Sequence, residues 1–216
     1  ANAPITRVEN LNDGRGYTCG WAGFTTADEE VVAVVEEYTR LVGHNHLAAL
    51  LPTLSLLNWN GSKSTVYLDN HDFTEHWGNA CSNPAFHAAY ATVVDRLFGV
   101  PAQKHCDELG LKLPVAYAIL FDSVVQHGND KDPDGVPAMI GRVNSWMHHT
   151  NPKERVFLEV FLEVRRQTLM NPSNTETRDE WRKSVARVDA LEGLLRTNPM
   201  LSAPVRVECA DWKVTL

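Results

Sequence analysis

Several features that define other protein classes are missing from this 216-residue sequence. No apolar run approaches the roughly 18 residues that a membrane span needs, which argues against a membrane protein. No two cysteines have C-x-x-C spacing, so zinc-ribbon and thioredoxin-like sites have no support. Basic residues are outnumbered, with 20 Lys and Arg against 27 Asp and Glu, and the formal charge of −7 repels nucleic acid and would attract a polycation.

Metal and disulfide chemistry have weak signals. The four cysteines, Cys19, Cys81, Cys106 and Cys209, permit two disulfides in any of three pairings, or four buried free thiols. The segment from Asp130 to Gly135 begins like an EF-hand loop, but its twelfth position is Gly141, where a bidentate Glu is required. His44 and His46 lack the i, i+4 spacing and the Glu of a helical zinc site, and we interpret them as surface or capping residues. We therefore expect no metal and no cofactor.

Helical periodicity dominates the chain, and strand signals are few. Thr26-Ala27-Asp28-Glu29 is a capping box, and the apolar spacing that follows predicts an amphipathic helix from Thr26 to Val42. Further helices are predicted at about 45–58, 84–98 and 114–127, and from about Thr177 to Leu195. Another helix is predicted to start at Asn151-Pro152 and to carry Phe157, Val160, Phe161 and Val164. The helix at 114–127 is apolar nearly all round, which predicts a central buried position. Residues 58–72 and 128–137 have loop composition.

The segment Asp13-Gly14-Arg15-Gly16-Tyr17-Thr18 groups a carboxylate, a guanidinium, a phenol and a hydroxyl around two glycines. Asp-Gly is also a common turn dipeptide, so this pattern alone supports a structural turn as well as it supports a site. The run from Val8 to Thr18, followed by Gly20, Gly23, Phe24 and a helix ending near Tyr38-Thr39, resembles the signature of glycoside hydrolase family 46, the chitosanases.

Five later segments resemble motifs of the same family in the same order. They are Phe73-Thr74-Glu75-His76-Trp77, Asp95-Arg96 before the next loop, Phe121 to Gly128, Phe161 to Arg165, and Ala186 to Asp189. The resemblance implies a single domain over residues 1–216, mainly α, with a lysozyme-like two-lobed helical fold, a substrate cleft and little β structure. It also implies endo-acting hydrolysis of the β-1,4-linked glucosamine polymer chitosan, with inversion.

An inverting enzyme needs one protonated carboxylic acid for the leaving oxygen and one carboxylate that activates water on the opposite face of the sugar. The resemblance implies that Asp13 is this base, that Thr18 helps to hold the water, and that Arg15 and Tyr17 shape the adjacent subsites. Glu30 falls where the family places a carboxylate that binds a substrate ammonium. The alternative for Glu30 is a solvated first-turn Glu favoured by the helix dipole. We expect Glu30 and Asp13 to face one cavity.

Two further groups of residues have both a functional and a structural interpretation. Asp122, Arg165 and Arg187 resemble a buried charge network behind the catalytic acid, and bracing between lobes is the alternative. Trp77 and Trp59 are candidate sugar-stacking residues, although core packing is the usual role of an aromatic side chain.

The general acid is the missing part of this assignment. In the family it is a Glu on an N-terminal helix well upstream of the Asp13 position, and only 12 residues precede Asp13 here. Three explanations are open: that helix was removed or lost, Glu9 has taken over as the acid, or the protein only binds chitosan or cell-wall glycan without cutting it. We expect a secreted, extracellular monomer whose partner is chitosan or a related amino-sugar polymer, with no nucleic acid or membrane partner.

Overall fold

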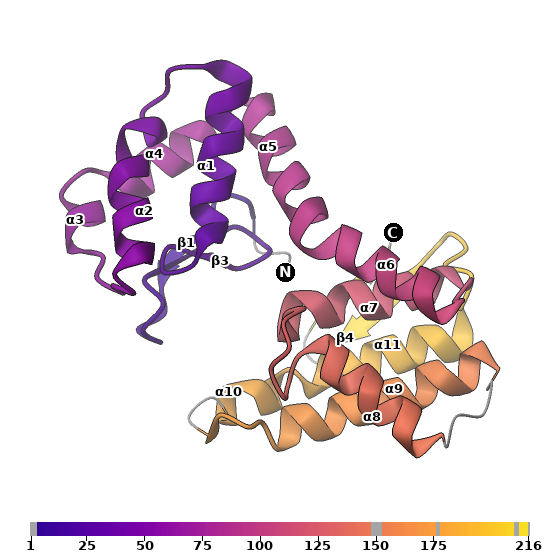
Figure 1. The fold of residues 1–216 in the computed structure, drawn as a ribbon. Helices are drawn as coiled ribbons and strands as arrows, with labels where there is room; N and C mark the ends of the chain where they lie inside the picture. Colours follow the sequence, from indigo (N-terminus) through magenta and orange to yellow (C-terminus); the bar gives the residue numbers. More distant parts are fainter. Residues whose placement is uncertain (1–3, 148–152, 176–177, 210–211, 216) are drawn as a thin grey trace. The chain divides into compact units, whose positions relative to one another are not determined.

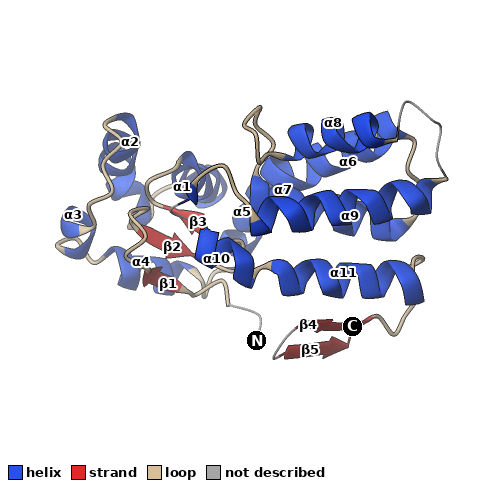
Figure 2. Ribbon diagram, turned by 90° about the horizontal axis from the view of Figure 1, so that it is seen from below, coloured by secondary structure: helices blue, strands red, loops and turns tan. Residues whose placement is uncertain are grey.

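The computed structural model describes residues 4–147, 153–175, 178–209 and 212–215. These residues form a mainly α-helical fold with a three-stranded and a two-stranded antiparallel sheet (Figures 1 and 2), which confirms the predicted fold class. The chain divides into two compact units, the first ending at Leu97 and the second beginning at Phe98. Among the described residues, no helix combines the length and hydropathy required to cross a membrane.

The first unit joins a small sheet to a group of helices. Its elements are β1 (Val8–Asn10), β2 (Tyr17–Cys19), β3 (Phe24–Thr25), α1 (Glu29–Val42), a 3₁₀ turn (Leu47–Leu50), α2 (Leu51–Trp59), α3 (Val66–Asp69), α4 (Phe73–Ala80) and α5 (Pro84–Val94). Helix α1 packs along α5 (Figure 1), because each carries apolar residues at helical spacing. Val34 and Tyr38 of α1 and Phe86 and Tyr90 of α5 are all buried.

Strands β1 and β2 form a hairpin in which Glu9 pairs with Thr18 and Asn10 with Tyr17. Strand β3 pairs with the other edge of β2 and leads into α1. The hairpin loop at residues 11–16 contains Asp13. Asp13 therefore belongs to the same unit as Glu30.

The second unit is built around α7 (Pro114–His127), which packs against four other helices. This confirms the predicted central helix. The remaining elements are α6 (Val100–Leu109), α8 (Val136–Trp146), α9 (Glu154–Met170), α10 (Arg178–Lys183), α11 (Val185–Thr197), β4 (Arg206–Cys209) and β5 (Trp212–Thr215). Helices α9 and α11 run side by side, and the hairpin of β4 and β5 lies along α11 (Figure 2).

Two predicted helices differ from the structure for local reasons. Helix α1 begins at Glu29 rather than Thr26, because Thr26 Oγ1 accepts a hydrogen bond from Tyr17 N at 2.9 Å and is not used as a cap. The predicted helix from Thr177 to Leu195 is two helices that meet at Ser184, whose N–H bonds to Trp181 O in a tight turn. Asn151, Pro152 and Thr177 lie outside the described residues.

The expectation of a loop after Asp95-Arg96 is wrong. Residues Asp95–Gly99 form a π-helical segment that joins α5 directly to α6. Pro101 lies in the first turn of α6, directly after this π-helical segment, so the proline does not end the helical run. Pro137 has the same position in α8, which begins at Val136 inside the predicted 128–137 loop. Helix α3 likewise lies inside the predicted 58–72 loop.

The four cysteines are buried free thiols, so the disulfide alternative is wrong. Cys19 and Cys81 belong to the first unit, and Cys106 and Cys209 to the second. Burial raises the pKa of the Cys81 and Cys106 thiols to about 11, and it raises the pKa of Cys19 still further.

Candidate active site

The loop that carries Asp13 depends on its glycines. Gly14 and Gly16 have φ angles of 78° and 72°, a region that residues with a side chain rarely adopt. A Cβ atom on Gly16 would clash with Thr26 Oγ1. The loop therefore needs Gly16 both for its backbone angle and for its close approach to Thr26.

Asp13 is held by Arg15, two residues along the chain. Asp13 Oδ2 accepts hydrogen bonds from Arg15 Nε at 3.0 Å and Nη2 at 2.8 Å, and Asp13 Oδ1 accepts one from Arg15 N at 3.1 Å. Partial burial acts to raise the pKa of Asp13, but the hydrogen bonds and charge of Arg15 outweigh it and lower the pKa below the ordinary value. The carboxylate is thus kept ionised, as a general base must be.

Thr18 lies on β2 with its side chain buried. Its hydroxyl oxygen has no hydrogen-bond partner among the described residues. Buried hydroxyls usually have a partner, so an unpaired one near a candidate site is a sign of a group that binds something other than the protein. Because Thr18 Oγ1 has almost no solvent-accessible surface, its role of holding a water stays a prediction.

Tyr17 contacts a residue that the sequence did not single out. Its phenol donates a hydrogen bond to Asp69 Oδ1 on α3, and this bond, followed by burial, raises the pKa of Tyr17 to about 12. The ring also stacks on Phe73, with 5.8 Å between centroids. Asp69 is 52 residues away in sequence, within the predicted 58–72 loop, and no local pattern marks it. Tyr17 is therefore a fixed phenol rather than a free one.

Glu9 lacks the setting of a general acid. Its side chain is 54% exposed, and its Oε2 accepts hydrogen bonds from Arg7 Nε at 3.0 Å and Nη2 at 2.8 Å. A carboxylic acid that keeps its proton near neutral pH usually lies in an apolar pocket without a cationic partner. The surroundings of Glu9 are the opposite of this.

Glu30 is half-buried at the start of α1, unlike a solvated first-turn Glu. Its Oε2 accepts a hydrogen bond from Thr25 N at 3.0 Å. Burial raises the pKa of Glu30. The hydrogen bond from the Thr25 N–H opposes this, the charge of Asp28 adds to it, and the charge of Arg15 opposes it least. An arriving ammonium would offset the cost of ionising this carboxyl. That Glu30 and Asp13 face one cavity stays a prediction.

The two tryptophans are placed in opposite environments. Trp77 is fully buried, packs edge-on against Phe86, and donates its indole N–H to Ile5 O at 2.9 Å. The stacking role expected for Trp77 does not fit this position, because its ring faces the core. Trp59, in contrast, is 87% exposed at the end of α2.

In the second unit, Asp122, Arg165 and Arg187 are in contact. Asp122 Oδ2 lies 2.7 Å from Arg165 Nη2, and Asp122 Oδ1 lies 2.5 Å from Arg187 Nη2. Burial alone would raise the pKa of Asp122, but Arg165 and Arg187 lower it overall. Because Arg165 is fully buried, its charge depends on Asp122 for compensation.

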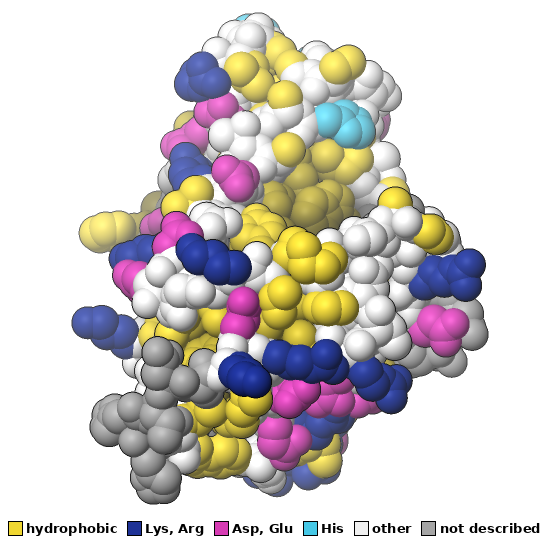
Figure 3. All heavy atoms as spheres, turned by 90° about the vertical axis from the view of Figure 1, so that its right-hand side faces the viewer, with side chains coloured by type: hydrophobic (Ala, Val, Ile, Leu, Met, Phe, Trp, Pro, Cys, Tyr) yellow, Lys and Arg dark blue, Asp and Glu magenta, His cyan; other side chains and the backbone are white. Residues whose placement is uncertain are grey.

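His127 extends this network with an uncharged group. Arg165 Nε donates a hydrogen bond to His127 Nε2 at 3.3 Å, and burial followed by the Arg165 charge lowers the pKa of His127 to about 3. The imidazole is therefore neutral and can accept from the guanidinium. Surface charges are arranged differently. Figure 3 shows acidic and basic side chains next to one another on one face of the molecule. In one surface ion pair, Arg166, which is 26% exposed, lies 2.7 Å from Asp189, which is 62% exposed.

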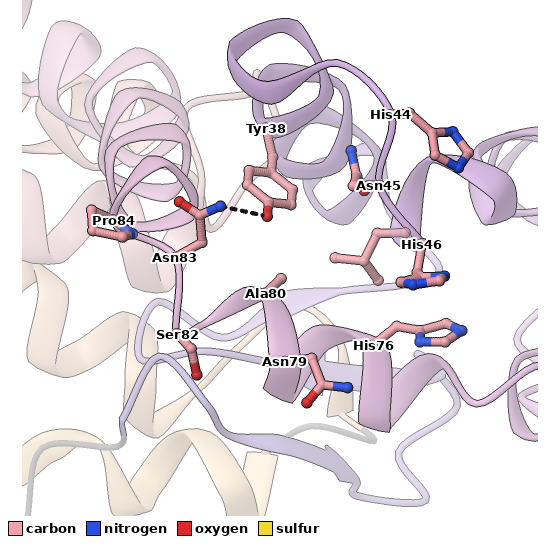
Figure 4. Close-up of a pocket in the computed structure, with 11 residues that line it drawn as sticks. Tyr38, His44, Asn45, His46, His76, Asn79, Ala80, Ser82, Asn83 and Pro84 are labelled. Carbon is pink, nitrogen blue, oxygen red and sulfur yellow. Dashed lines mark hydrogen bonds between the residues drawn. The ribbon is translucent and has the colours of Figure 1, made fainter.

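A pocket of about 540 Å³ that the sequence did not predict lies between α1, the 3₁₀ turn and α4. Figure 4 shows the rings of His46 and His76 facing one another within it, stacked with centroids 4.9 Å apart. His46 precedes the 3₁₀ turn but makes no side-chain cap, so the capping interpretation of this residue is wrong and the surface interpretation is confirmed. None of the predicted site residues lines this pocket.

The carboxylates of the EF-hand-like segment are used within the protein. Asp132 Oδ1 accepts from Asp134 N, and Asp134 Oδ2 accepts from both the N–H and the hydroxyl of Ser173. In the described part of the chain, no group of three or more His, Cys, Asp or Glu is arranged to hold a metal ion.

The loop that keeps Asp13 ionised beside Arg15 supplies one of the two carboxyl groups that glycoside hydrolases use. The family model for glycosyl hydrolase family 46 matches residues 3–205. The chain therefore belongs to this family, as its motifs indicated.

Similar proteins support the same assignment. A chitosanase from Bacillus subtilis (strain 168) is 43% identical over 210 residues, which are 95% of this chain and 75% of that protein. The crystal structure of native chitosanase from Bacillus subtilis MY002 matches with a TM-score of 0.90 and 41% identity, over 99% of this chain and 90% of that chain. A family 46 chitosanase from Gynuella sunshinyii, in complex with chitotetraose, matches with a TM-score of 0.90 and 37% identity, over 99% and 89%.

Proposed function

We propose that this chain is a chitosanase that cuts the β-1,4 bonds of chitosan with inversion, and that Asp13 is its general base. The observation that carries the assignment of Asp13 is its bidentate contact with Arg15, which lowers the pKa of the carboxyl. A base with a lowered pKa stays ionised in mildly acidic solution, where the amines of chitosan are protonated.

In this mechanism Asp13 accepts a proton from a water molecule, with Thr18 accepting or donating a hydrogen bond to hold that water. The water oxygen forms a bond to the anomeric carbon from one face while the bond to the leaving oxygen breaks on the other. A carboxylic acid on the leaving-group side gives its proton to that oxygen. The sugar thus ends with inverted configuration, and the acid and base exchange protons with solvent before the next cycle.

The substrate class is supported by charge and by the relatives. The formal charge of −7 attracts a polymer that carries an ammonium on each sugar. The Gynuella enzyme is a chitosanase with chitotetraose bound. We assign Glu30 the contact with a substrate ammonium, because a half-buried carboxylate with a raised pKa gains most from an incoming opposite charge. A polymer too large to enter a cell also supports an extracellular site of action.

Glu9 is not the proton donor in this proposal. The exposure of Glu9 and its pairing with Arg7 favour a structural role at the edge of the sheet. The test compares Asp13→Asn with Glu9→Gln by measuring reducing ends released from chitosan. Asp13→Asn should lower kcat by about 10² to 10⁴, the range for loss of a general base, while Glu9→Gln should retain most activity.

Controls separate chemistry from folding and binding. Both variants should keep the circular dichroism spectrum of the original protein, and Asp13→Asn should still bind chitosan. A Glu9→Gln variant as inactive as Asp13→Asn, with folding intact, would make Glu9 the acid. Hydrolysis by the folded Asp13→Asn variant at the original rate would exclude Asp13 as the base, and no hydrolysis by the original chain would refute the function itself.

A further inference from the structure

A second pocket of the first unit, of about 580 Å³, lies between α1 and α2. It is lined by Glu29 and Glu36 of α1, by Trp59 at the end of α2, and by Arg96. None of the residues assigned to hydrolysis lines this pocket, and it is distinct from the pocket that contains His46 and His76. Its lining combines an aromatic ring, two carboxylates and one guanidinium.

The exposure of Trp59 is the first reason to regard this pocket as a binding site. Its side chain is 87% exposed, whereas Trp77 in the same unit is fully buried. Because almost none of the Trp59 side chain is buried, packing in the protein core does not explain its position. A large exposed ring beside a hollow offers a flat apolar face, and the C–H face of a sugar ring is apolar and matches it.

The carboxylates supply the second reason. Glu29 and Glu36 are seven residues apart, so they lie on one side of α1 about 10 Å apart along its axis. Among the described residues neither forms an ion pair, whereas the neighbouring Glu37 is paired with Arg40 at 2.7 Å. Two unpaired carboxylates beside an aromatic ring complement a ligand that has both a cation and a sugar face.

Arg96 restricts which ligand fits. With one guanidinium and two carboxylates, the pocket carries a net negative charge of one, so it favours a cationic ligand over an anionic one. The guanidinium has only donors and would pair with sugar hydroxyl oxygens. An ammonium group would lie at the carboxylate side, since Arg96 repels it.

The pocket is held close to the helix start that carries Glu30. Asn58 Nδ2 donates a hydrogen bond to Asp28 O at 3.0 Å, which fixes the end of α2 to the residue just before α1. Glu29, in the pocket lining, directly precedes Glu30 in the sequence. A sugar bound in the pocket would therefore contact α1, the helix that also carries Glu30, the carboxylate assigned to a substrate ammonium.

We propose that this pocket binds a glucosamine unit of chitosan, with the sugar face on the Trp59 ring and the ammonium at Glu29 and Glu36. It is an additional contact for the polymer and takes no part in bond cleavage. The proposal rests on chitosan being the substrate, and it adds a residue, Trp59, that determines how well long chains bind.

The test measures binding of a glucosamine hexamer by calorimetry to protein that carries Asp13→Asn, so that the ligand is not cut. Adding Trp59→Ala should weaken binding about two- to fivefold, the effect of losing one exposed stacking contact between a sugar face and an aromatic ring. Glu36→Gln should weaken it by a similar factor at low salt and by less at high salt, because exposed charges are screened. A hexamer of N-acetylglucosamine, which has no ammonium, should respond to Trp59→Ala but not to Glu36→Gln.

The matched control is Trp146→Ala, which removes an exposed tryptophan from α8 of the second unit and should leave the affinity unchanged. The melting temperature of Trp59→Ala should equal that of the parent, because the ring is hardly buried. Equal affinities for the parent and Trp59→Ala would overturn the pocket assignment.

Reducing-end release from a glucosamine tetramer, measured in Asp13-containing protein, separates the two proposals. If the protein hydrolyses the tetramer but Trp59→Ala does not change hexamer binding, only the assignment of the pocket is refuted. Binding that depends on Trp59 in a chain that releases no reducing ends refutes only the catalytic function.

Discussion

Replacing Asp122 with Asn should destabilise the protein far more than replacing Asp189 with Asn. Each carboxylate lies 2.7 Å from one guanidinium nitrogen, and Asp122 also lies 2.5 Å from Arg187 Nη2. They differ in burial: the Asp122 side chain is 25% exposed and the Asp189 side chain is 62% exposed. The partner of Asp122, Arg165, is fully buried.

The magnitudes follow from what each change leaves behind. Without Asp122, the Arg165 charge stays in the interior with no anion, and breaking a buried pair in this way costs about 3–5 kcal/mol. The partial exposure of Asp122 favours the lower end, about 3 kcal/mol. Without Asp189, Arg166 is still next to Glu192 and still reaches water, so the loss should be at most about 1 kcal/mol.

Thermal unfolding provides the assay. In a chain of this length 1 kcal/mol shifts the melting temperature by about 2–4 °C, so Asp122→Asn should lower it by about 6–12 °C and Asp189→Asn by at most about 4 °C. Adding Arg165→Met to Asp122→Asn should recover part of the loss, because the unpaired buried charge is then removed. Equal shifts for Asp122→Asn and Asp189→Asn would refute the argument, as would a further loss in the double variant.

The same network gives a pH dependence with a definite sign. The pKa of Asp122 is lower in the folded protein than its ordinary value of 3.8, because Arg165 and Arg187 outweigh the opposing effect of burial. The stabilisation by Asp122 is therefore complete above that ordinary value and is lost as the pH falls toward the lowered pKa. The difference in unfolding free energy between the original protein and Asp122→Asn should accordingly shrink over this acidic range.

Three further predictions concern the first unit. Arg15→Gln removes the group that lowers the pKa of Asp13, so the acidic limb of the pH profile of kcat/KM should move to higher pH. Thr18→Val should lower kcat about tenfold, the worth of one hydrogen bond, yet leave the free energy of unfolding unchanged or raised because the buried hydroxyl has no partner. Trp77→Ala should lower the free energy of unfolding, measured by chemical denaturation, by about 3–5 kcal/mol, because the Trp77 ring is fully buried. Loss of an exposed ring would lower it far less.

Periodicity predicted α1, which has an apolar stripe, and α7, which is apolar nearly all round, although neither has a side-chain N-cap. It missed α6 and α8, because each has a proline next to its start and the sequence does not say whether a proline ends one helix or begins another. The π-helical segment Asp95–Gly99 before α6 was not predicted either.

The site was predicted only in part for a similar reason. The loop around Asp13 is local in sequence and its glycines mark it, so Asp13 and Arg15 could be found together. The contact of Tyr17 with Asp69 joins residues far apart and could not. Burial of Trp77 had a usable signal, because Phe73, Trp77 and Ala80 lie at i, i+4 and i+7 on one side of α4, which is typical of a core stripe.

The burial of all four thiols, two in each unit, gives the protein four internal reporters of opening. Only a thiolate reacts with an alkylating reagent, and both burial and a raised pKa suppress that form in the native state. Alkylation of a given cysteine should therefore be limited by transient opening of its surroundings. Mass spectrometry of labelled peptides would then report the opening of the first unit through Cys19 and Cys81 and that of the second through Cys106 and Cys209, without any added probe.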